Sequence, residues 1–223
     1  MKTIILSAGR GERMQPLTNK TPKPLLKVGG KRLIEHTIEA LVDAGFSDIV
    51  INYAHLGEQF PATLGDGSRY GANIQYSNED AGRLETAGGI ANALPLLGNE
   101  PFLVVNGDIW TDYPFHQLKA ISLNSDLLCH LVLVNNPEHN PTGDFALQSG
   151  LLMTSGQDKF TYSGIGLYHP TLFAGLKPEA RPLKPILMKA IAAQQASGEI
   201  YSGQWSDIGT VERLETLSQQ LTP

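Results

Sequence analysis

The chain has 223 residues, of which 41% are hydrophobic and 17% are charged, and these values are typical of a globular protein with one domain. The net charge of −5 argues against general binding to nucleic acid, and no apolar run reaches the ~20 residues of a membrane-spanning helix. The single cysteine, Cys129, excludes an intrachain disulfide, and the apolar N-terminal stretch is too short for a signal peptide, which favours the cytoplasm.

In the first half of the chain, apolar runs rich in β-branched residues alternate with segments of helical period. The helical segment that begins at Leu33 ends at Ala44-Gly45, a typical helix C-cap, and Pro61 makes the short second helix irregular. Strands are predicted over residues 3–6, 48–53, 74–77 and 102–106, and helices over 33–42, 56–64 and 85–97.

The second half has a more mixed pattern, with loops predicted over residues 135–143 and 155–159. The last helix is expected to have Thr210 or Gly209 as its N-cap. Strands are predicted over residues 127–134, 145–152 and 160–168, and helices over 183–195 and from 210 to about 220.

Alternating strands and helices predict right-handed βαβ units. The expected fold is α/β, with a doubly wound, Rossmann-like, mixed and mostly parallel sheet in a single domain. Ligands bind at the carboxyl ends of the strands in such sheets. The segments 7–13 and 107–108 should therefore lie at the same edge.

A glycine-rich, basic segment follows the first predicted strand: Ala8-Gly9-Arg10-Gly11-Glu12-Arg13, with a rigid Pro22-Lys23-Pro24 after it. Residues 1–32 hold eight Lys or Arg and a single acid, Glu12. Glycines let backbone N–H groups approach a phosphate, and fixed cations balance its charge. We predict a nucleoside triphosphate site here. A nicotinamide site is disfavoured, because Met14 stands where the dinucleotide fingerprint needs a small residue.

Two acidic residues are candidates for a divalent cation. Asp108 follows the apolar strand in Asn106-Gly107-Asp108, and Asp207 lies in Trp205-Ser206-Asp207-Ile208-Gly209-Thr210. Carboxylates are ligands for Mg²⁺. Each could equally serve as a turn or cap residue, and spacing alone does not decide between these roles.

The string Gly9-x-Gly11-x-Arg13-x-x-Pro16-Leu17-Thr18 with Pro22-Lys23-Pro24 resembles the signature of sugar-1-phosphate nucleotidyltransferases. The resemblance implies catalytic roles for Arg13, Lys23, Asp108 and Asp207, with the two aspartates holding Mg²⁺. It implies a nucleotide-binding half over about residues 1–110 and a sugar-binding half over about 111–223. The residues implied for nucleotide binding are Ala8, Gly9, Gly11, Glu12, Arg13, Lys23, Glu79, Gly88 and Asn106.

Some of these nucleotide residues have ordinary structural interpretations as well. Glu79 could read a base edge or be a solvated loop acid, and Ala87-Gly88-Gly89 could contact the nucleotide or serve helix packing. Glu85 stands where the family commonly has Gly. On the sugar side the resemblance points to Gly143, Asp144, Ser163 and Gly164. The family's Glu-Lys-Pro segment is absent, and Lys159 lies in that region without its context.

Over its whole length the chain is most similar to short uridylyltransferases that act on N-acetylmuramic acid 1-phosphate in peptidoglycan recycling. The expected partners are UTP and this sugar phosphate, for a monomer or a small homo-oligomer without nucleic acid or membrane. The alternatives are a hexose-1-phosphate guanylyl- or thymidylyltransferase and a non-catalytic nucleotide-sensing homologue. Arg13, Lys23, Asp108 and Asp207 are all present, which disfavours the latter.

Overall fold

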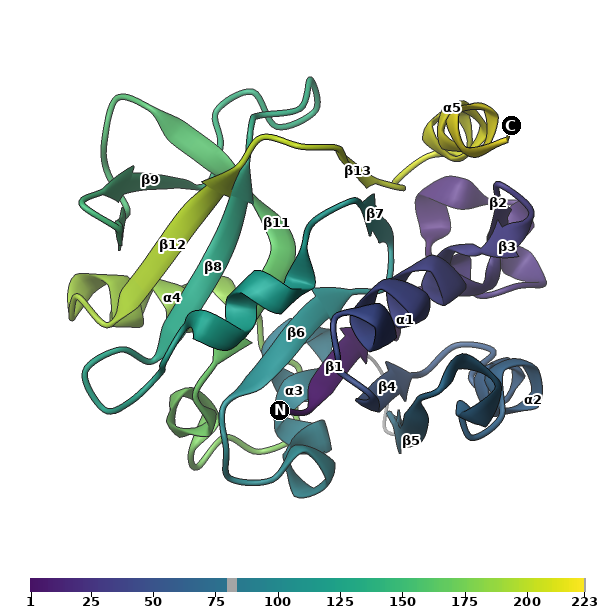
Figure 1. Ribbon diagram of the computed structural model, residues 1–223, viewed down its shortest axis with the longest axis horizontal. Helices are drawn as coiled ribbons and strands as arrows, with labels where there is room; N and C mark the ends of the chain where they lie inside the picture. The colour runs from purple at the N-terminus through teal and green to yellow at the C-terminus, as the bar shows by residue number, and fades with distance from the viewer. Residues whose placement is uncertain (80–83, 223) are drawn as a thin grey trace.

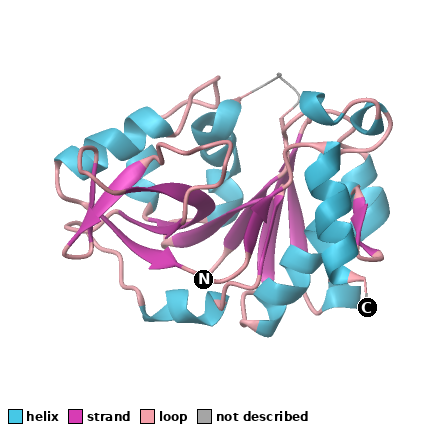
Figure 2. Ribbon diagram, turned by 90° about the horizontal axis from the view of Figure 1, so that it is seen from above, coloured by secondary structure: helices cyan, strands magenta, loops and turns pink. Residues whose placement is uncertain are grey.

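The computed structural model describes residues 1–79 and 84–222. Their main feature is a mixed sheet of nine strands with helices on both faces (Figures 1 and 2). In spatial order the strands are β5 (Asn73–Asn78), β4 (Asp48–Tyr53), β1 (Thr3–Leu6), β6 (Phe102–Asn106), β11 (Lys159–Tyr168), β8 (Cys129–Val134), β12 (Ala196–Tyr201), β10 (Leu151–Met153) and β9 (Phe145–Gln148).

The core lies on both faces of this sheet because neighbouring side chains of each strand point to opposite sides. Ile5 packs with α1 (Leu33–Asp43) and α2 (Gln59–Leu64), whereas its neighbour Ile4 packs with α3 (Glu85–Leu97) and α4 (Lys184–Ala192). Buried apolar residues on both sides fit the continuously apolar strands that the sequence shows in this region.

The two parts of the sheet differ in strand direction. From β5 through β4 and β1 to β6, all pairings are parallel. Beyond β6, β11 runs antiparallel to both of its long neighbours, and only β8 and β12 pair in parallel. The predicted mixed α/β sheet is thus confirmed, and its parallel arrangement is concentrated in the N-terminal part.

Most predicted elements of the first half are confirmed, several with the same bounds, whereas the second half needs three corrections. The strand predicted over 145–152 is a hairpin of β9 and β10, because Ser149 and Gly150 form a turn with φ of 51° and 80°. The helix predicted over 183–195 ends at Ala192, and strand β12, which sequence patterning missed, follows it. Lys159, predicted to lie in a loop, begins β11.

A short ladder joins the two parts of the chain near the carboxyl end of β6. β7 (Ile109–Thr111) pairs antiparallel with β13 (Trp205–Asp207), so that Asp207 lies opposite Ile109. The helix α5 (Val211–Leu221) follows, with Thr210 as its N-cap, and packs beside the hairpin of β2 (Lys27–Val28) and β3 (Lys31–Arg32) (Figure 1). Among the described residues, no helix is both long and apolar enough to cross a membrane.

Candidate active site

A cavity of about 870 Å³ opens at the carboxyl ends of β1 and β6, where ligands bind in open α/β sheets. Its walls come from the glycine-rich loop, the start of α3, β11 and the start of α4. The predicted site residues that line it are Ala8, Gly9, Gly11, Glu12, Arg13, Lys23, Glu79, Asn106, Asp108 and Asp144.

The glycine-rich loop presents a row of free backbone donors to this cavity. Within the described part of the chain, the N–H groups of residues 9–13 donate to no acceptor. Gly11 adopts the left-handed conformation with φ 64°, and a Cβ there would lie 2.9 Å from Thr18 Cγ2. The Thr18 hydroxyl donates to the Gly11 carbonyl at 2.9 Å and holds the loop in place. A run of N–H groups without protein acceptors, in a loop that lines the cavity, can bind an anion.

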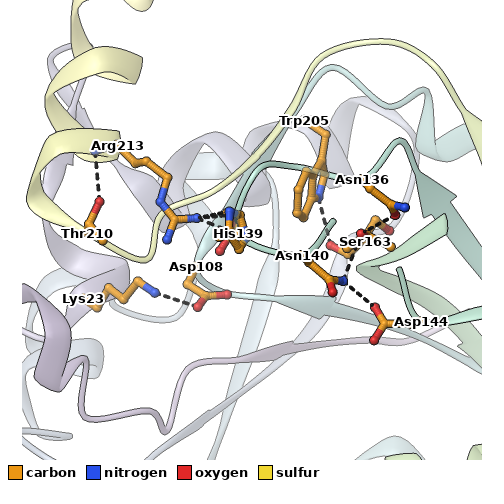
Figure 3. Close-up of polar contacts among 12 residues, drawn as sticks. Lys23, Asp108, Asn136, His139, Asn140, Asp144, Ser163, Trp205, Thr210 and Arg213 are labelled. Carbon is orange, nitrogen blue, oxygen red and sulfur yellow. Dashed lines mark hydrogen bonds and ion pairs between the residues drawn. The ribbon is translucent and has the colours of Figure 1, made fainter. Parts of the chain in front are cut away.

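Lys23 and Asp108 both line the cavity and contact each other. The Lys23 ammonium donates to Asp108 Oδ2 at 2.7 Å, and the lysine is only 8% exposed although it carries a charge (Figure 3). The flanking prolines restrict the backbone beside the lysine. Gly107 permits the turn that carries Asp108, because a Cβ there would lie 2.6 Å from Ser7 Oγ.

Asp207 does not line the cavity itself, but the β7–β13 ladder places it next to Asp108 in the fold. The backbone N–H of Ile208 donates to the Asp108 carbonyl at 2.8 Å. The Asp207 carboxylate accepts from Arg213 at 2.5 Å and lies 3.0 Å from His139 Nε2. Figure 3 shows Arg213 and His139 on the same side as Lys23 and Asp108.

The donor set of Asp108 and Asp207 fits a hard cation such as Mg²⁺. Both side chains offer carboxylate oxygens, and Mg²⁺ in phosphate sites takes one or two carboxylates and fills its remaining positions with phosphate and water oxygens. Among the described residues no three His, Cys, Asp or Glu side chains form a metal-binding group.

Away from the residues predicted to bind the sugar, a buried chain of hydrogen bonds runs from the backbone of Ser7 through Asn52 to Glu79. The backbone N–H of Ser7 donates to Asn52 Oδ1 at 2.7 Å, and Asn52 Nδ2 donates to Glu79 Oε1 at the same distance. Burial raises the pKa of the Glu79 carboxyl, although the Asn52 hydrogen bond opposes the shift. Glu79 is thus buried in the cavity wall, not a solvated loop acid.

The start of α3 contains two glycines with close neighbours and, at position 85, a residue other than glycine with positive φ. A Cβ on Gly88 would overlap the carbonyl oxygen of Glu179, so this glycine serves packing, whereas a Cβ on Gly89 would lie 2.5 Å from Glu79 Oε1. Glu85, where the family commonly has Gly, adopts φ 56° and lines the cavity. Glycine adopts a positive φ without steric cost, which is a physical reason for glycine at this position in the family.

On the side of the cavity predicted to bind the sugar, polar side chains from the 135–143 loop and β11 form one network. Asp144 Oδ2 accepts from the backbone N–H of Tyr162 at 3.0 Å and from Asn140 Nδ2 at 3.2 Å. Asn140 and Asn136 also bond to the hydroxyl of Thr161, at 3.0 and 2.9 Å (Figure 3). Asp144 is therefore held in a fixed orientation at the cavity wall.

The other three predicted sugar residues lie behind that wall. Gly143 adopts φ 62° directly before Asp144. The hydroxyl of buried Ser163 donates to the Val132 carbonyl at 2.7 Å, and the Ser163 carbonyl accepts from Trp205 Nε1 at 2.9 Å. Gly164, with φ 84°, packs against Asn106 where the β11–β8 register shifts. None of the three lines the cavity, and the Ser163 hydroxyl is already occupied by its bond to Val132.

Sequence reasoning missed several residues at the site. Asn52 could have been found from its place near the carboxyl end of a predicted strand. Arg213 is the third residue of the last helix and lies three positions after the Trp205–Thr210 string, which is a weaker signal. His139 and Tyr162 carry no local pattern that points to a site, because only the fold brings their segments to the cavity region.

Comparison with known proteins gives a consistent result. The profile of the family described as "Nucleotidyl transferase" matches residues 2–143. The chain is 52% identical to the N-acetylmuramate alpha-1-phosphate uridylyltransferase of Neisseria meningitidis serogroup B, over 96% of each chain. It is 32% identical to the protein of the same name from Caulobacter vibrioides, over 92% of this chain and 90% of that one.

A solved structure shares the fold at lower identity. A Bacillus anthracis protein, provisionally assigned as a glucose-1-phosphate thymidylyltransferase, superposes with a TM-score of 0.87 at 23% identity. The superposition covers 99% of this chain and 95% of that chain. This likeness supports the architecture described above, which extends over both parts of the sheet.

Proposed function

The chain belongs to the nucleotidyl transferase family and is a sugar-1-phosphate nucleotidyltransferase, and we propose that it transfers the uridylyl group of UTP to N-acetylmuramic acid 1-phosphate. The products are UDP-N-acetylmuramic acid and pyrophosphate. The proposal places the reaction in the cytoplasm, in the recycling of peptidoglycan sugars.

The observation that carries the choice of substrates is the 52% identity to the Neisseria meningitidis uridylyltransferase over 96% of both chains. The site is compatible with the reaction. Within the described chain it has N–H groups without acceptors and cations for a triphosphate, a lysine–carboxylate pair, and a fixed polar network around Asp144. These three features correspond to binding of the triphosphate, transfer of the uridylyl group and binding of the sugar phosphate.

In the proposed reaction an oxygen of the sugar phosphate attacks the α-phosphorus of UTP in line. The bond from the α-phosphorus to the bridging oxygen breaks, and pyrophosphate leaves with the electron pair. The attacking phosphate needs no general base, because its second pKa is about 6 and it is mostly ionised at pH 7. The main obstacle is repulsion between two anions, so catalysis depends on position and charge.

The roles of the residues follow from this obstacle. The N–H groups of residues 9–13 bind the phosphates of UTP, and Arg13 balances the charge of the β- and γ-phosphates that leave together. We assign Lys23 to the two reacting phosphates, and this role is supported by its burial and its bond to Asp108. A cation fixed in advance stabilises developing charge without reorganisation during the reaction.

Asp108 and Asp207 are the residues that would hold Mg²⁺. Bound there, the ion would supply Lewis-acid stabilisation to the phosphate oxygens. The chain's own contribution is to orient both carboxylates through the β7–β13 ladder and the bond from Ile208 to Asp108.

The experiment is pyrophosphate release across a matrix of substrates. UTP, dTTP, GTP, ATP and CTP are crossed with the 1-phosphates of N-acetylmuramic acid, N-acetylglucosamine, glucose and mannose, with and without Mg²⁺. We expect the strongest release from UTP with N-acetylmuramic acid 1-phosphate, lost without the metal. Preference for GTP with mannose 1-phosphate or dTTP with glucose 1-phosphate would contradict the substrates but keep the reaction. Failure of every combination, with UTP still bound, would favour a non-catalytic homologue.

A further inference from the structure

The basic residues of the cavity are unevenly distributed along the chain. Among the described residues that line it, Arg10, Arg13 and Lys23 come from the N-terminal loop and its continuation, on the nucleotide side. The fourth cation is Lys184, the first residue of α4, on the wall that also carries Asp144 and Tyr162. The sugar side therefore has a cation of its own that the proposed reaction does not use.

The ammonium of Lys184 has free hydrogen-bonding capacity. Its ionic partner within the described chain is Asp144 Oδ1, at 3.9 Å, which is too long for a hydrogen bond. Asp144 is held through its other oxygen by Tyr162 and Asn140, so it does not depend on the lysine. The Lys184 side chain is 67% exposed, and its three N–H donors can turn to a ligand in the cavity.

The backbone of Lys184 is nevertheless well placed. Leu183 before it and Leu187 one turn later are both buried in the core on the face of the sheet that α3 and α4 cover. Pro185 restricts the start of the helix. The cavity wall next to it includes Leu183 and Leu187 themselves. A flexible side chain on a fixed backbone can reach over part of the sugar site without moving the fold.

Muramic acid differs from glucosamine by a lactyl ether, which adds a carboxylate to the sugar. Near Asp144 this carboxylate would be repelled unless a cation lay beside it, because like charges at close range disfavour binding. Resting on the proposed function, we propose that Lys184 binds the lactyl carboxylate and thereby distinguishes this sugar from neutral sugar phosphates. The pairing is a charge-assisted hydrogen bond, with Asp144 keeping the lysine near the cavity between turnovers.

The test compares two substrates and four proteins. The substrates are N-acetylmuramic acid 1-phosphate and the same compound with its lactyl carboxylate converted to the neutral amide, each with saturating UTP. The proteins are the wild type, Lys184→Met, Lys184→Arg and Lys189→Met. Lys189 is an exposed lysine later on the same helix and outside the cavity lining, so its variant controls for loss of a helix charge.

We expect Lys184→Met to raise KM for the acid roughly tenfold, the size of one charge-assisted hydrogen bond, and to change KM for the amide less than about twofold. Lys184→Arg should have a KM for the acid close to that of the wild type, and Lys189→Met should have wild-type KM values for both substrates. Equal effects of Lys184→Met on both substrates, or no effect on either, would overturn the proposal while the uridylyl transfer stands. If the wild type does not use N-acetylmuramic acid 1-phosphate, the proposed function fails and the role of Lys184 fails with it.

Discussion

The parts of the cavity wall that we assign to the nucleotide and to the sugar, called here the nucleotide side and the sugar side, are built in different ways. The nucleotide side comes mainly from a contiguous stretch, residues 8–24, which supplies backbone donors and cations at the ends of parallel strands. The sugar side is assembled from the 135–143 loop, β11 and the start of α4, which meet only in the fold. A triphosphate needs concentrated positive charge, and one loop can provide it. A sugar needs separate donors and acceptors in several directions.

This contrast leads to an expectation about kinetics. Changes at the centre of the nucleotide side should lower kcat, because these groups interact most strongly with charge that develops in the reaction. Changes on the sugar side should raise KM for the sugar phosphate with little effect on kcat, because they remove ground-state binding.

The largest effect is expected for Asp108→Asn. The amide keeps the shape but loses the charge that pairs with Lys23 at 2.7 Å, so kcat should fall about a thousandfold or more. Steady-state kinetics with saturating substrates and Mg²⁺ measures this. The matched control is Asp112→Asn, which changes an exposed aspartate bonded to the backbone of Gln204 and should stay within about twofold of wild type. A near wild-type rate for Asp108→Asn would remove this residue from the reaction centre.

Lys23→Met should have the next largest effect. Loss of a fixed cation at the reacting phosphates is expected to cost about 3 kcal/mol, or roughly a hundredfold in kcat. Lys27→Met, an exposed lysine on β2, serves as the control. If only the KM for UTP changes in Lys23→Met, the lysine binds the nucleotide without acting in the transfer.

Substitutions of Gly9 and of Gly11 should have different effects, one on nucleotide binding and the other on stability. A Cβ on Gly9 would meet no protein atom within 4 Å, and Gly9 lines the cavity. Gly9→Ala should therefore leave the melting temperature unchanged and raise the KM for UTP roughly tenfold, since one added carbon crowds the ligand. Gly11→Ala should instead lower the free energy of unfolding by about 1–2 kcal/mol, because φ is 64° there. Thermal unfolding of both variants distinguishes these cases, and a destabilised Gly9→Ala would contradict the assignment.

On the sugar side, Asn140→Ala removes two bonds, to Asp144 and to Thr161, and loosens the wall. We expect KM for the sugar phosphate to rise about fivefold, the value of roughly one net hydrogen bond, with kcat and the KM for UTP unchanged. Gln148→Ala, at an exposed position of β9, is the control. A loss in kcat instead would show that the two sides are not separable in this way.

The smallest predicted effect concerns the pH dependence of stability at Glu79. Burial raises the pKa of this carboxyl above 4.5, so the folded protein holds the proton more readily than the unfolded chain does. The contribution of Glu79 to stability therefore falls as pH rises from the unfolded pKa to the folded pKa. Glu79→Gln lacks this loss and can still accept from Asn52. Its free energy of unfolding should increase relative to wild type between pH 4 and pH 7, and no such increase would contradict the shift.

The difference between the two sides also explains how much the sequence alone could predict. The strands at 3–6, 48–53 and 102–106 were predicted with the bounds that the structure has, because buried parallel strands are continuous apolar runs. The cavity residues of the basic loop were found because phosphate binding needs glycines and cations close together in sequence.

Elements of the sugar side gave weaker signals. β12 is the sequence Ala-Ser-Gly-Glu-Ile-Tyr, which has neither an apolar run nor strict alternation, and its place is fixed by pairing with β8. The β7–β13 ladder joins residues far apart in the chain and has three residues on each side. Asn140 and Lys184 have no local pattern that marks them, because only the fold brings them close to Asp144.

The most direct test of the central claim follows the α-phosphate of UTP. Purified protein is incubated with UTP labelled with ³²P at the α-position, N-acetylmuramic acid 1-phosphate and Mg²⁺, and the labelled products are separated and identified by mass. We predict that the label moves to UDP-N-acetylmuramic acid while the released pyrophosphate is unlabelled. Label in the inorganic phosphate fraction, or label that remains in UTP while the protein is folded and binds the nucleotide, would contradict it.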